Sequence, residues 1–233
     1  LHLLLKPIDN RIKVRNDWEK LEVVAPDVDE SVIAQVSVVL AHTPGIANFS
    51  LVAEYPVGDL DDIFQKVLFH WRDALAGKTF CVRARRHGNH EFTSTQVEQY
   101  VGGGLLHNSD AKGVQLRTPD IVVPLEIKWD RLFVISKKTQ GLGGYPLGAQ
   151  DAVLSLISGG FDSTVSTYLC IKRGLRAHYC FFNLGGRAHE IGVKEVAYYL
   201  WNKYGASHRV KFVTVPFEDV VREILEKVEN PYM

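Results

Sequence analysis

The sequence predicts an α/β protein whose two parts are organised differently. Residues 151–233 alternate regularly between apolar, strand-like runs and helix-like runs, which is typical of a parallel sheet with right-handed crossovers. Residues 1–138 mix strand-like and helix-like runs without that alternation, which favours an α+β arrangement. Between them, residues 139–150 include four glycines and one proline, so we expect a linker or a shaped loop there.

The composition is that of an ordinary globular protein. The 233 residues are 46% hydrophobic and 23% charged, which excludes a disordered or low-complexity chain. The three cysteines have no paired spacing, so they exclude a disulfide scaffold and suit a reducing, cytoplasmic compartment. No apolar run is long enough to cross a membrane. The balance of 27 basic against 27 acidic residues excludes a uniformly basic RNA binder but not a local basic cluster.

The elements of the first part follow from short apolar patterns and turn residues. Residues at helical spacing predict helices, and β-branched or apolar runs predict strands. The strands expected here are Leu3–Leu5, Leu21–Val24, Thr79–Ala84, Ile121–Ile127 and Arg131–Ser136, and the helices are Ser31–His42 and Asp61–Leu75. Thr95 and Glu98 fit a capping box at the start of a further helix. That helix is expected to run towards Gly102–Gly104, which would end it or bring backbone close to a ligand.

The elements of the second part alternate more clearly. We predict strands at Ala152–Ile157, Arg176–Asn183 and Arg209–Pro216, and helices at Phe161–Arg173, Glu190–Tyr204 and Phe217–Val228. Three parallel strands form only half of a doubly wound domain. Because the chain starts at Leu1 and its single methionine is Met233, we expect it to be a piece of a longer protein.

A glycine-rich hexapeptide, Ser158-Gly-Gly-Phe-Asp-Ser163, lies directly between the first strand and the first helix of the second part. Its two glycines allow a tight turn and let an anion approach without meeting a Cβ atom. The helix that follows offers unpaired N–H groups and the positive end of its dipole, and Ser158 and Ser163 add hydroxyl groups. The Gly-Lys-Ser/Thr ending of a Walker loop is absent. The pattern predicts a pyrophosphate-binding turn, and the alternative is a glycine-rich turn that binds nothing.

This hexapeptide resembles the SGGxDS signature of the PP-loop ATP pyrophosphatases, which cleave ATP between its α and β phosphates. The wider sequence resembles the tRNA 4-thiouridine synthetase (tRNA sulfurtransferase) family. The similar segments are Gly141–Gly148, Val153–Ile157, Cys180–Gly186 and Ala188–Gly192, together with Phe80–Gly88, Phe92 and Val101–Gly104, which resemble that family's THUMP domain. The resemblance implies a shortened ferredoxin-like region at 1–30, a THUMP domain at 31–138 and the first half of a PP-loop domain, of the adenine nucleotide alpha hydrolase-like type, at 151–233.

The resemblance also implies which residues bind ATP. Those expected to cradle the phosphates are Ser158, Gly159, Gly160, Asp162 and Ser163, and those expected to contact the nucleotide are Leu156, Ile157, Phe181 and Phe182. Asp162 would position the phosphates through Mg²⁺, which binds few carboxylates and completes its shell with phosphates. Taken alone, Phe181 and Phe182 could equally pack in the core, and Asp162 could simply start the helix.

The candidate RNA-binding segment is Lys78–His90, which has no acidic residue. Its cations are Lys78, Arg83, Arg85 and Arg86. On a strand, Arg83 and Arg85 would point to one face and Arg86 to the other. Such a cluster can contact phosphates whatever the net charge of the chain, and the alternative is a sheet edge protected by charge. The similarity to a THUMP domain favours RNA, with tRNA as the partner.

In the family that the chain resembles, ATP adenylates O4 of a tRNA uridine, and a persulfide sulfur then displaces AMP to give 4-thiouridine. Family members also transfer sulfur for the synthesis of the thiamine thiazole. The resemblance therefore implies ATP and Mg²⁺ as cofactors, with tRNA and a cysteine desulfurase-type persulfide donor as partners. It is compatible with a homodimer.

The sequence departs from that family in three ways. Leu3–Leu5 and Leu21–Val24 are too close for the helix that the family has there, and the PP-loop domain stops after its third strand. The catalytic cysteine of the family lies further along, and neither Cys170 nor Cys180 replaces it. We therefore expect the full protein to be an enzyme, and we expect these 233 residues alone to be unable to catalyse turnover. The alternatives are another PP-loop adenylating enzyme, such as an amidotransferase or a lysidine-type tRNA ligase, and a non-catalytic RNA-binding module.

Overall fold

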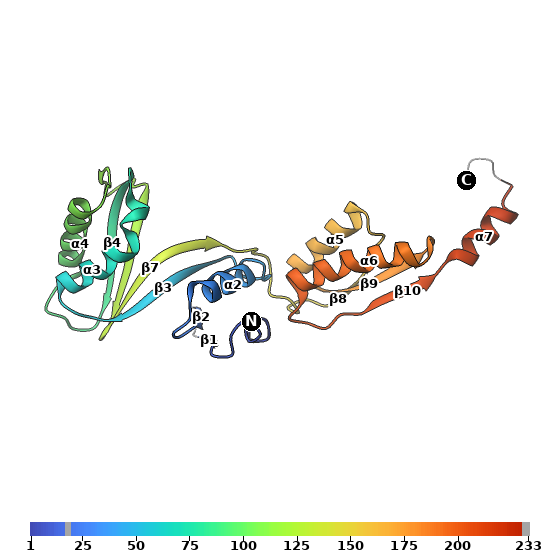
Figure 1. The fold of residues 1–233 in the computed structure, drawn as a ribbon, viewed down its shortest axis with the longest axis horizontal. Coiled ribbons are helices and arrows are strands. Elements are labelled where there is room, and N and C mark those ends of the chain that lie inside the picture. Colours follow the sequence, from blue (N-terminus) through green and yellow to red (C-terminus); the bar gives the residue numbers. More distant parts are fainter. Residues whose placement is uncertain (17–19, 230–233) are drawn as a thin grey trace. The chain divides into compact units, whose positions relative to one another are not determined.

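The structure, a computed structural model, describes residues 1–16 and 20–229 and divides into two units (Figure 1). Unit 1 comprises Leu1–Phe49 and Gln140–Met233, and unit 2 comprises Ser50–Thr139. Unit 1 holds a parallel sheet and unit 2 a mixed sheet, so the predicted α/β class is confirmed. No helix in the described ranges is long and apolar enough to cross a membrane.

The N-terminal segment of unit 1 differs from the prediction. Its elements are α1 (His2–Leu5), β1 (Lys13–Asn16), β2 (Leu21–Val24) and α2 (Glu30–Ala41), with β1 and β2 forming an antiparallel hairpin. The prediction of a strand at Leu3–Leu5 was wrong. These residues lie in a helical turn, and the buried side chain of Leu5 belongs to the same core cluster as Val36 and Leu40 of α2. A run of three leucines is too short for a helical period to be distinguished from a strand period.

Unit 2 is a five-stranded sheet with helices packed against it. In chain order its elements are β3 (Asn48–Pro56), α3 (Leu60–Trp71), the 3-10 turn η1 (Asp73–Leu75), β4 (Thr79–His87), α4 (Ser94–Asn108), β5 (Gly113–Val114), β6 (Ile121–Lys128) and β7 (Arg131–Gln140). The strand order is β3-β7-β6-β4-β5. Alternate residues of β6 are fully buried against a core that includes Trp71, as expected for a strand covered by helices on one face.

The helix α4 begins two residues before the predicted position. Thr93 is the N-cap: its hydroxyl accepts a hydrogen bond from Gln96 N at 3.2 Å, and Gln96 Oε1 accepts one from Thr93 N at 2.8 Å. The capping box predicted at Thr95 and Glu98 was therefore wrong, although both pairs satisfy the same pattern. Glu98 instead accepts a hydrogen bond from Ala84 N of β4 at 2.9 Å.

The glycines Gly102–Gly104 lie inside α4, so the prediction that they end the helix was wrong. They let the helix approach its neighbours closely. A Cβ atom on Gly102 would lie 3.8 Å from Val82 Cγ2, and one on Gly104 would lie 2.5 Å from the ring of Phe64 in α3.

The second part of unit 1 forms the predicted parallel sheet, in the order β10-β9-β8. Its elements are β8 (Ala152–Leu156), α5 (Phe161–Lys172), β9 (Arg176–Asn183), α6 (Gly186–Leu200), the π-helical turn η2 (Trp201–Gly205), β10 (Phe212–Pro216) and α7 (Glu218–Lys227). The helix α6 begins at Gly186 and not at Glu190, since the Gly185–Gly186 turn already starts it.

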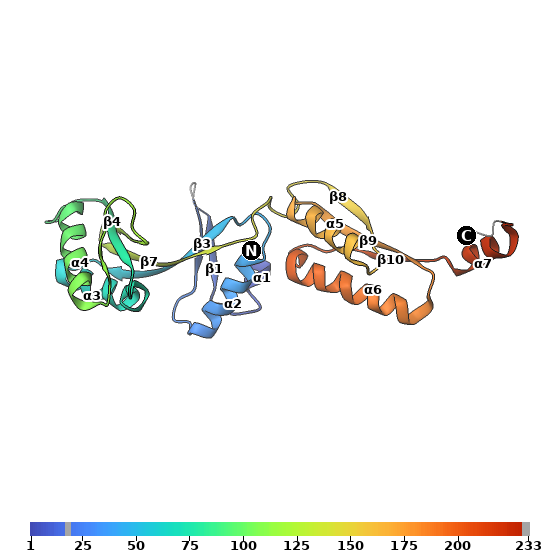
Figure 2. The same ribbon diagram turned by 90° about the horizontal axis from the view of Figure 1, so that it is seen from above.

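Both α5 and α6 lie on one face of this sheet (Figures 1 and 2). Ser155 and Tyr179 point to that face, where Ser155 hydrogen-bonds Thr167 of α5 and Tyr179 belongs to the core. Burial raises the pKa of the Tyr179 phenol to about 12. The opposite face carries apolar side chains that are largely exposed, namely Leu154, Leu156, Phe182 and Val213.

Candidate functional site

The turn after β8 leaves open space in front of the start of α5. Gly159 has a φ of +85°, and a Cβ atom there would lie 3.1 Å from Val193 Cγ2, so this position requires glycine. Gly160 is the N-cap of α5 and provides no side-chain cap. A Cβ atom on Gly160 would have only Ser158 Oγ, at 3.5 Å, within 4 Å. The turn therefore has room for a ligand directly over the helix start.

The two serines of the hexapeptide bond within the turn itself. Ser163 Oγ accepts from Ser158 N at 3.3 Å and donates to Gly160 O at 3.2 Å. Ser158 Oγ accepts from Gly160 N at 3.4 Å. In the described part of the chain, the backbone N–H groups of Phe161, Asp162 and Ser163 have no partner. These N–H groups, at the positive end of the helix dipole, are the donors that an anion would meet.

A buried hydroxyl anchors α5 to the sheet beneath the turn. Thr167 is 1% exposed, and its Oγ1 lies 2.5 Å from Ser155 Oγ of β8 and donates to Ser163 O at 2.6 Å. Ile157 N donates to Cys180 O at 2.9 Å, which ties the end of β8 to β9. The helix start is therefore held in a fixed position, as a preorganised donor site requires.

The carboxylate of Asp162 lies in the first turn of α5 and is exposed. It has no hydrogen bond or ion pair within residues 1–16 and 20–229, and no cluster of three metal-ligating side chains occurs in those ranges. A single carboxylate beside an anion-binding turn fits Mg²⁺ only when phosphate oxygens supply further ligands. The residues of the turn thus fit a magnesium-bound nucleotide and not a free metal ion.

The four predicted nucleotide contacts divide into two classes. The side chains of Ile157 and Phe181 are 3% and 1% exposed and belong to the core. Those of Leu156 and Phe182 are 62% and 41% exposed and lie on the sheet face opposite α5 and α6. Only the second pair offers side-chain surface to a ligand, so the structure separates residues that the sequence grouped together.

Sequence reasoning assigned no role to His189, which lies beside the turn. It lies in the first turn of α6, where its Nε2 is 3.4 Å from Ser158 O and its ring meets Phe181 edge-to-face at 5.1 Å. The signal was available, because in a parallel sheet the helix starts after neighbouring strands lie at the same edge. Glu190, the next residue, accepts from Lys194 and Thr214, and these hydrogen bonds lower the pKa of its carboxyl.

The four basic candidates in unit 2 are not equivalent. Arg85 is exposed and has no hydrogen bond or ion pair in the described part of the chain. Arg83 donates to Leu116 O at 2.8 Å and lies 3.9 Å from a carboxylate oxygen of Glu98. Arg86 is partly buried on the other side of the strand and donates to Gly88 O at 2.8 Å.

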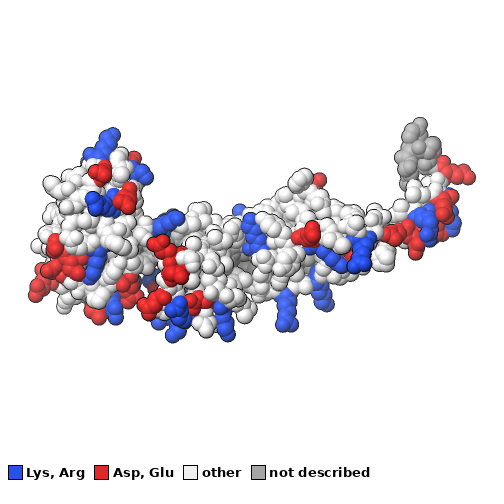
Figure 3. Space-filling model, viewed as in Figure 1, with Lys and Arg blue, Asp and Glu red and all other residues white. Residues whose placement is uncertain are grey.

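Lys78 lies near Asp120, an acidic residue that comes from outside the segment Lys78–His90. Asp120 accepts from Thr79 N at 2.8 Å and from Thr79 Oγ1 at 2.7 Å. These hydrogen bonds, with the charges of Lys112 and Lys78, lower the pKa of the Asp120 carboxyl. The segment without acidic residues in sequence is therefore partly neutralised in space. On the face drawn in Figure 3, basic and acidic side chains of the described residues are interspersed.

Two family models match this chain, one within each unit. A model of the THUMP domain matches residues 57–136, and a model described as thiamine biosynthesis protein (ThiI) matches residues 148–233. The tRNA sulfurtransferase of Saccharophagus degradans is 56% identical over 228 residues, which are 98% of this chain and 47% of that protein. That of Shewanella woodyi is 54% identical over 230 residues, 99% of this chain and 48% of its own.

The chain belongs to the tRNA sulfurtransferase family. It spans about half the length of the curated relatives that it matches. Two solved structures share its fold. A 4-thiouridine synthetase–RNA complex with bound ATP has a TM-score of 0.77 at 21% identity and matches 98% of this chain and 60% of its own. PH1313 from Pyrococcus horikoshii has a TM-score of 0.72 at 20% identity, with 96% and 77% covered.

Proposed function

We propose that this chain forms the ATP-binding and tRNA-binding part of an enzyme that makes 4-thiouridine in tRNA. The observation that carries the proposal is the open, donor-lined turn at the start of α5, in a chain whose relatives are named tRNA sulfurtransferases. The solved relative that holds both RNA and ATP supports the same pairing of ligands.

In this proposal the turn binds the phosphates of ATP. The free N–H groups at Phe161–Ser163 face the negative charge, and the hydroxyls of Ser158 and Ser163 keep the turn in shape. Asp162 would hold Mg²⁺, which would offset the phosphate charge, and the exposed side chains of Leu156 and Phe182 are available to the rest of the nucleotide.

Bound ATP would activate the uridine by adenylation of O4 with release of pyrophosphate. A persulfide sulfur could then attack C4 and displace AMP, and a further thiol would break the S–S bond of the persulfide and end in a disulfide. In this proposal none of Cys81, Cys170 and Cys180 acts as the catalytic cysteine, and a cysteine desulfurase-type donor supplies the persulfide. The same delivery of sulfur would serve thiamine thiazole synthesis. Unit 2 positions the tRNA, which raises the effective concentration of the uridine at the turn.

The nucleotide site is tested by titrating ATP into Asp162→Asn with and without Mg²⁺. We expect weaker binding than the parent chain in Mg²⁺, and equal or tighter binding without Mg²⁺ because a negative charge beside the phosphates is removed. Asp151→Asn is the matched control, since Asp151 is also exposed in unit 1. An equal loss in both conditions would show that Asp162 acts on the helix and not through the metal.

The RNA site is tested by tRNA binding at several salt concentrations. Arg85→Glu should weaken binding and lower the slope of log affinity against log salt by about 0.7 to 0.9 for each phosphate that the variant no longer neutralises. Arg72→Glu, an exposed arginine at the end of α3, should leave both quantities unchanged. If charge reversal at Arg85 has no effect, another PP-loop adenylating enzyme becomes the better interpretation.

A further inference from the structure

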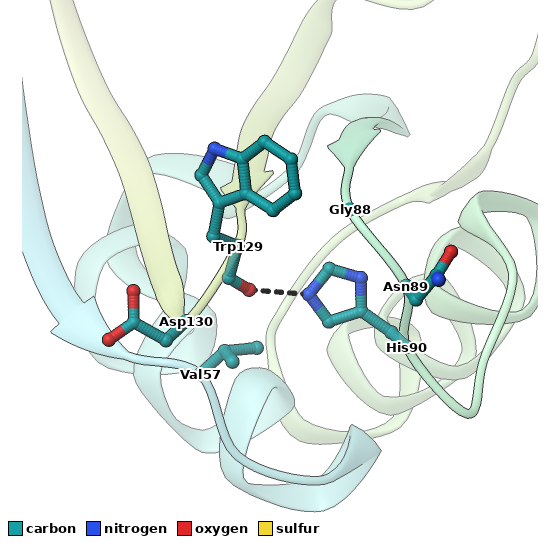
Figure 4. Close-up of a pocket in the computed structure, with 6 residues that line it drawn as sticks. All are labelled: Val57, Gly88, Asn89, His90, Trp129 and Asp130. Carbon is teal, nitrogen blue, oxygen red and sulfur yellow. Dashed lines mark hydrogen bonds between the residues drawn. The ribbon is translucent and has the colours of Figure 1, made fainter.

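A hollow of about 690 Å³ lies in unit 2 beside the turn between β6 and β7 (Figure 4). It is lined by Val57, Gly88, Asn89, His90, Trp129 and Asp130. The lining combines one large aromatic surface with an amide and a carboxylate at the edges. Gly88, Asn89 and His90 are the end of the candidate RNA-binding segment Lys78–His90, but none of the four cations of that segment lines the hollow.

Trp129 presents its indole to solvent from a fixed backbone. Trp129 is 73% exposed, and its φ of +54° lies in the left-handed region of backbone conformations. A bulky residue rarely adopts that conformation, for which asparagine or glycine is better suited. The backbone is held on both sides, because Trp129 N donates to His87 O at 3.0 Å and Trp129 O lies 2.6 Å from His90 Nε2. The turn thus keeps a large ring where a small residue would be less strained.

A chain of hydrogen bonds fixes the opposite wall of the hollow. Arg86 Nη1 lies 3.1 Å from His90 Nδ1. Because a guanidinium can only donate, Nδ1 must accept, and Nε2 therefore carries the proton that it donates to Trp129 O. Gly88 has a φ of +103°, and a Cβ atom there would lie 3.1 Å from Trp129 Cε3, so glycine at this position lets the indole lie against the backbone.

We propose that one unpaired base of RNA stacks on the Trp129 indole in this hollow. The proposal rests on the RNA-binding role proposed above for unit 2. A fixed, exposed aromatic ring is the surface on which bases of single-stranded RNA stack, and the Asn89 amide, which also lines the hollow, can both donate to and accept from a base edge. Lys128 and Arg131 flank the turn. Lys128 Nζ is paired with Glu126 Oε1 at 3.2 Å, so Arg131 is the cation that would meet a neighbouring phosphate.

An apolar peptide is the less suitable occupant because the rim is charged. Asp130 lies 3.9 Å from Arg131, and Arg131 lies 3.7 Å from Glu54, so both ion pairs are long and solvent-exposed. Such weak pairs leave the arginine able to meet a phosphate. A base within a duplex has no free face for the indole, so single-stranded RNA is favoured over paired RNA.

The test is Trp129→Asn, because asparagine suits the left-handed backbone while it removes the stacking surface. Urea unfolding should show this variant to be at least as stable as the parent chain. Its affinity for a short single-stranded RNA should fall by roughly 5- to 150-fold, the range expected for one stacked base. Trp129→Phe should retain part of the affinity, and Phe69→Ala, which removes an 82%-exposed ring on α3, should retain all of it.

The outcomes separate this inference from the proposed function. Unchanged affinity of Trp129→Asn, with a loss in Arg85→Glu, overturns the stacking site and leaves the RNA-binding role intact. No binding of RNA or tRNA by the parent chain overturns both. Equal losses in Trp129→Asn and Phe69→Ala, or an equal loss for duplex RNA of the same length, also overturn the stacking site.

Discussion

Two adjacent glycines in α4 should respond in opposite ways to the same substitution. A Cβ atom on Gly103 would have nothing within 4 Å, whereas one on Gly104 would lie 2.5 Å from Cδ2 and Cε2 of Phe64. Phe64 is 6% exposed and packs edge-to-face on Tyr100, so its ring has little freedom to move away. Both glycines are interior to the same helix, and the intrinsic helical gain from alanine is therefore the same at both.

The magnitudes follow from these contacts. Replacing glycine by alanine in an open helix interior stabilises by about 1 kcal/mol, so Gly103→Ala should raise the free energy of unfolding of unit 2 by about that amount. For a domain of about 60–100 residues this corresponds to a Tm increase of about 4–8 °C. At Gly104 the new contact is roughly 1 Å shorter than van der Waals separation, and overpacking costs about 1–3 kcal/mol. Gly104→Ala should therefore be destabilising by up to about 2 kcal/mol.

The assay is urea unfolding monitored by amide exchange of the buried strand β6, which reports on unit 2 and not on unit 1. The midpoint should rise for Gly103→Ala and fall for Gly104→Ala, with the denaturant slope unchanged in both. Adding Phe64→Leu to Gly104→Ala should recover part of the loss, since leucine leaves room for the new methyl group. If Gly104→Ala stabilises as much as Gly103→Ala, α3 and α4 are not in the tight contact described.

Three further predictions concern other parts of the chain. Thr167→Val should lower the Tm of unit 1, because it leaves the Ser155 hydroxyl without its partner at a cost of about 1–3 kcal/mol. Thr167→Ser keeps the hydroxyl and loses only a buried methyl group, so it should lower the Tm less, and differential scanning calorimetry distinguishes the two. Gly159→Ala should weaken ATP binding in calorimetric titration, since alanine is strained at a φ of +85°. Burial lowers the pKa of His70, which lies 2.7 Å from the Tyr55 hydroxyl, so its contribution to stability should be complete above about pH 6.5 and be lost as the pH falls below it; a His70→Gln variant should show a flatter pH dependence of urea unfolding.

The parallel sheet could be predicted because its signals are local. The strands β8 and β9 end shortly before Gly159 and Gly185, and Arg176–Asn183 was predicted with the bounds that the structure has. The strand Asn48–Pro56 was missed, since its apolar residues do not alternate clearly and its partner β7 is far away in sequence. The choice between Thr93 and Thr95 as the N-cap depended on side-chain geometry that the shared pattern does not contain.

The position of the proposed nucleotide-binding turn could be predicted from the sequence, but the hydrogen-bonding role of each residue within it could not. That Ser158 and Ser163 bond to the backbone of the turn, and do not face open space, depends on distances within six residues. The basic cluster illustrates a longer-range limit. The neighbours that partly neutralise Arg83 and Lys78 are Glu98 and Asp120, which reach them from other elements.

The sheet face that carries Leu154, Leu156, Phe182 and Val213 has a consequence for work with this chain in solution. These side chains are 41–62% exposed, and the strands β8 and β10 beside them are both sheet edges. Apolar surface next to unpaired strand edges promotes contact between copies. Light scattering should therefore show self-association that rises with protein concentration and is reduced by Leu154→Lys. Ligand titrations should therefore use the lowest workable protein concentration, so that self-association does not compete with the binding of ATP at the neighbouring turn.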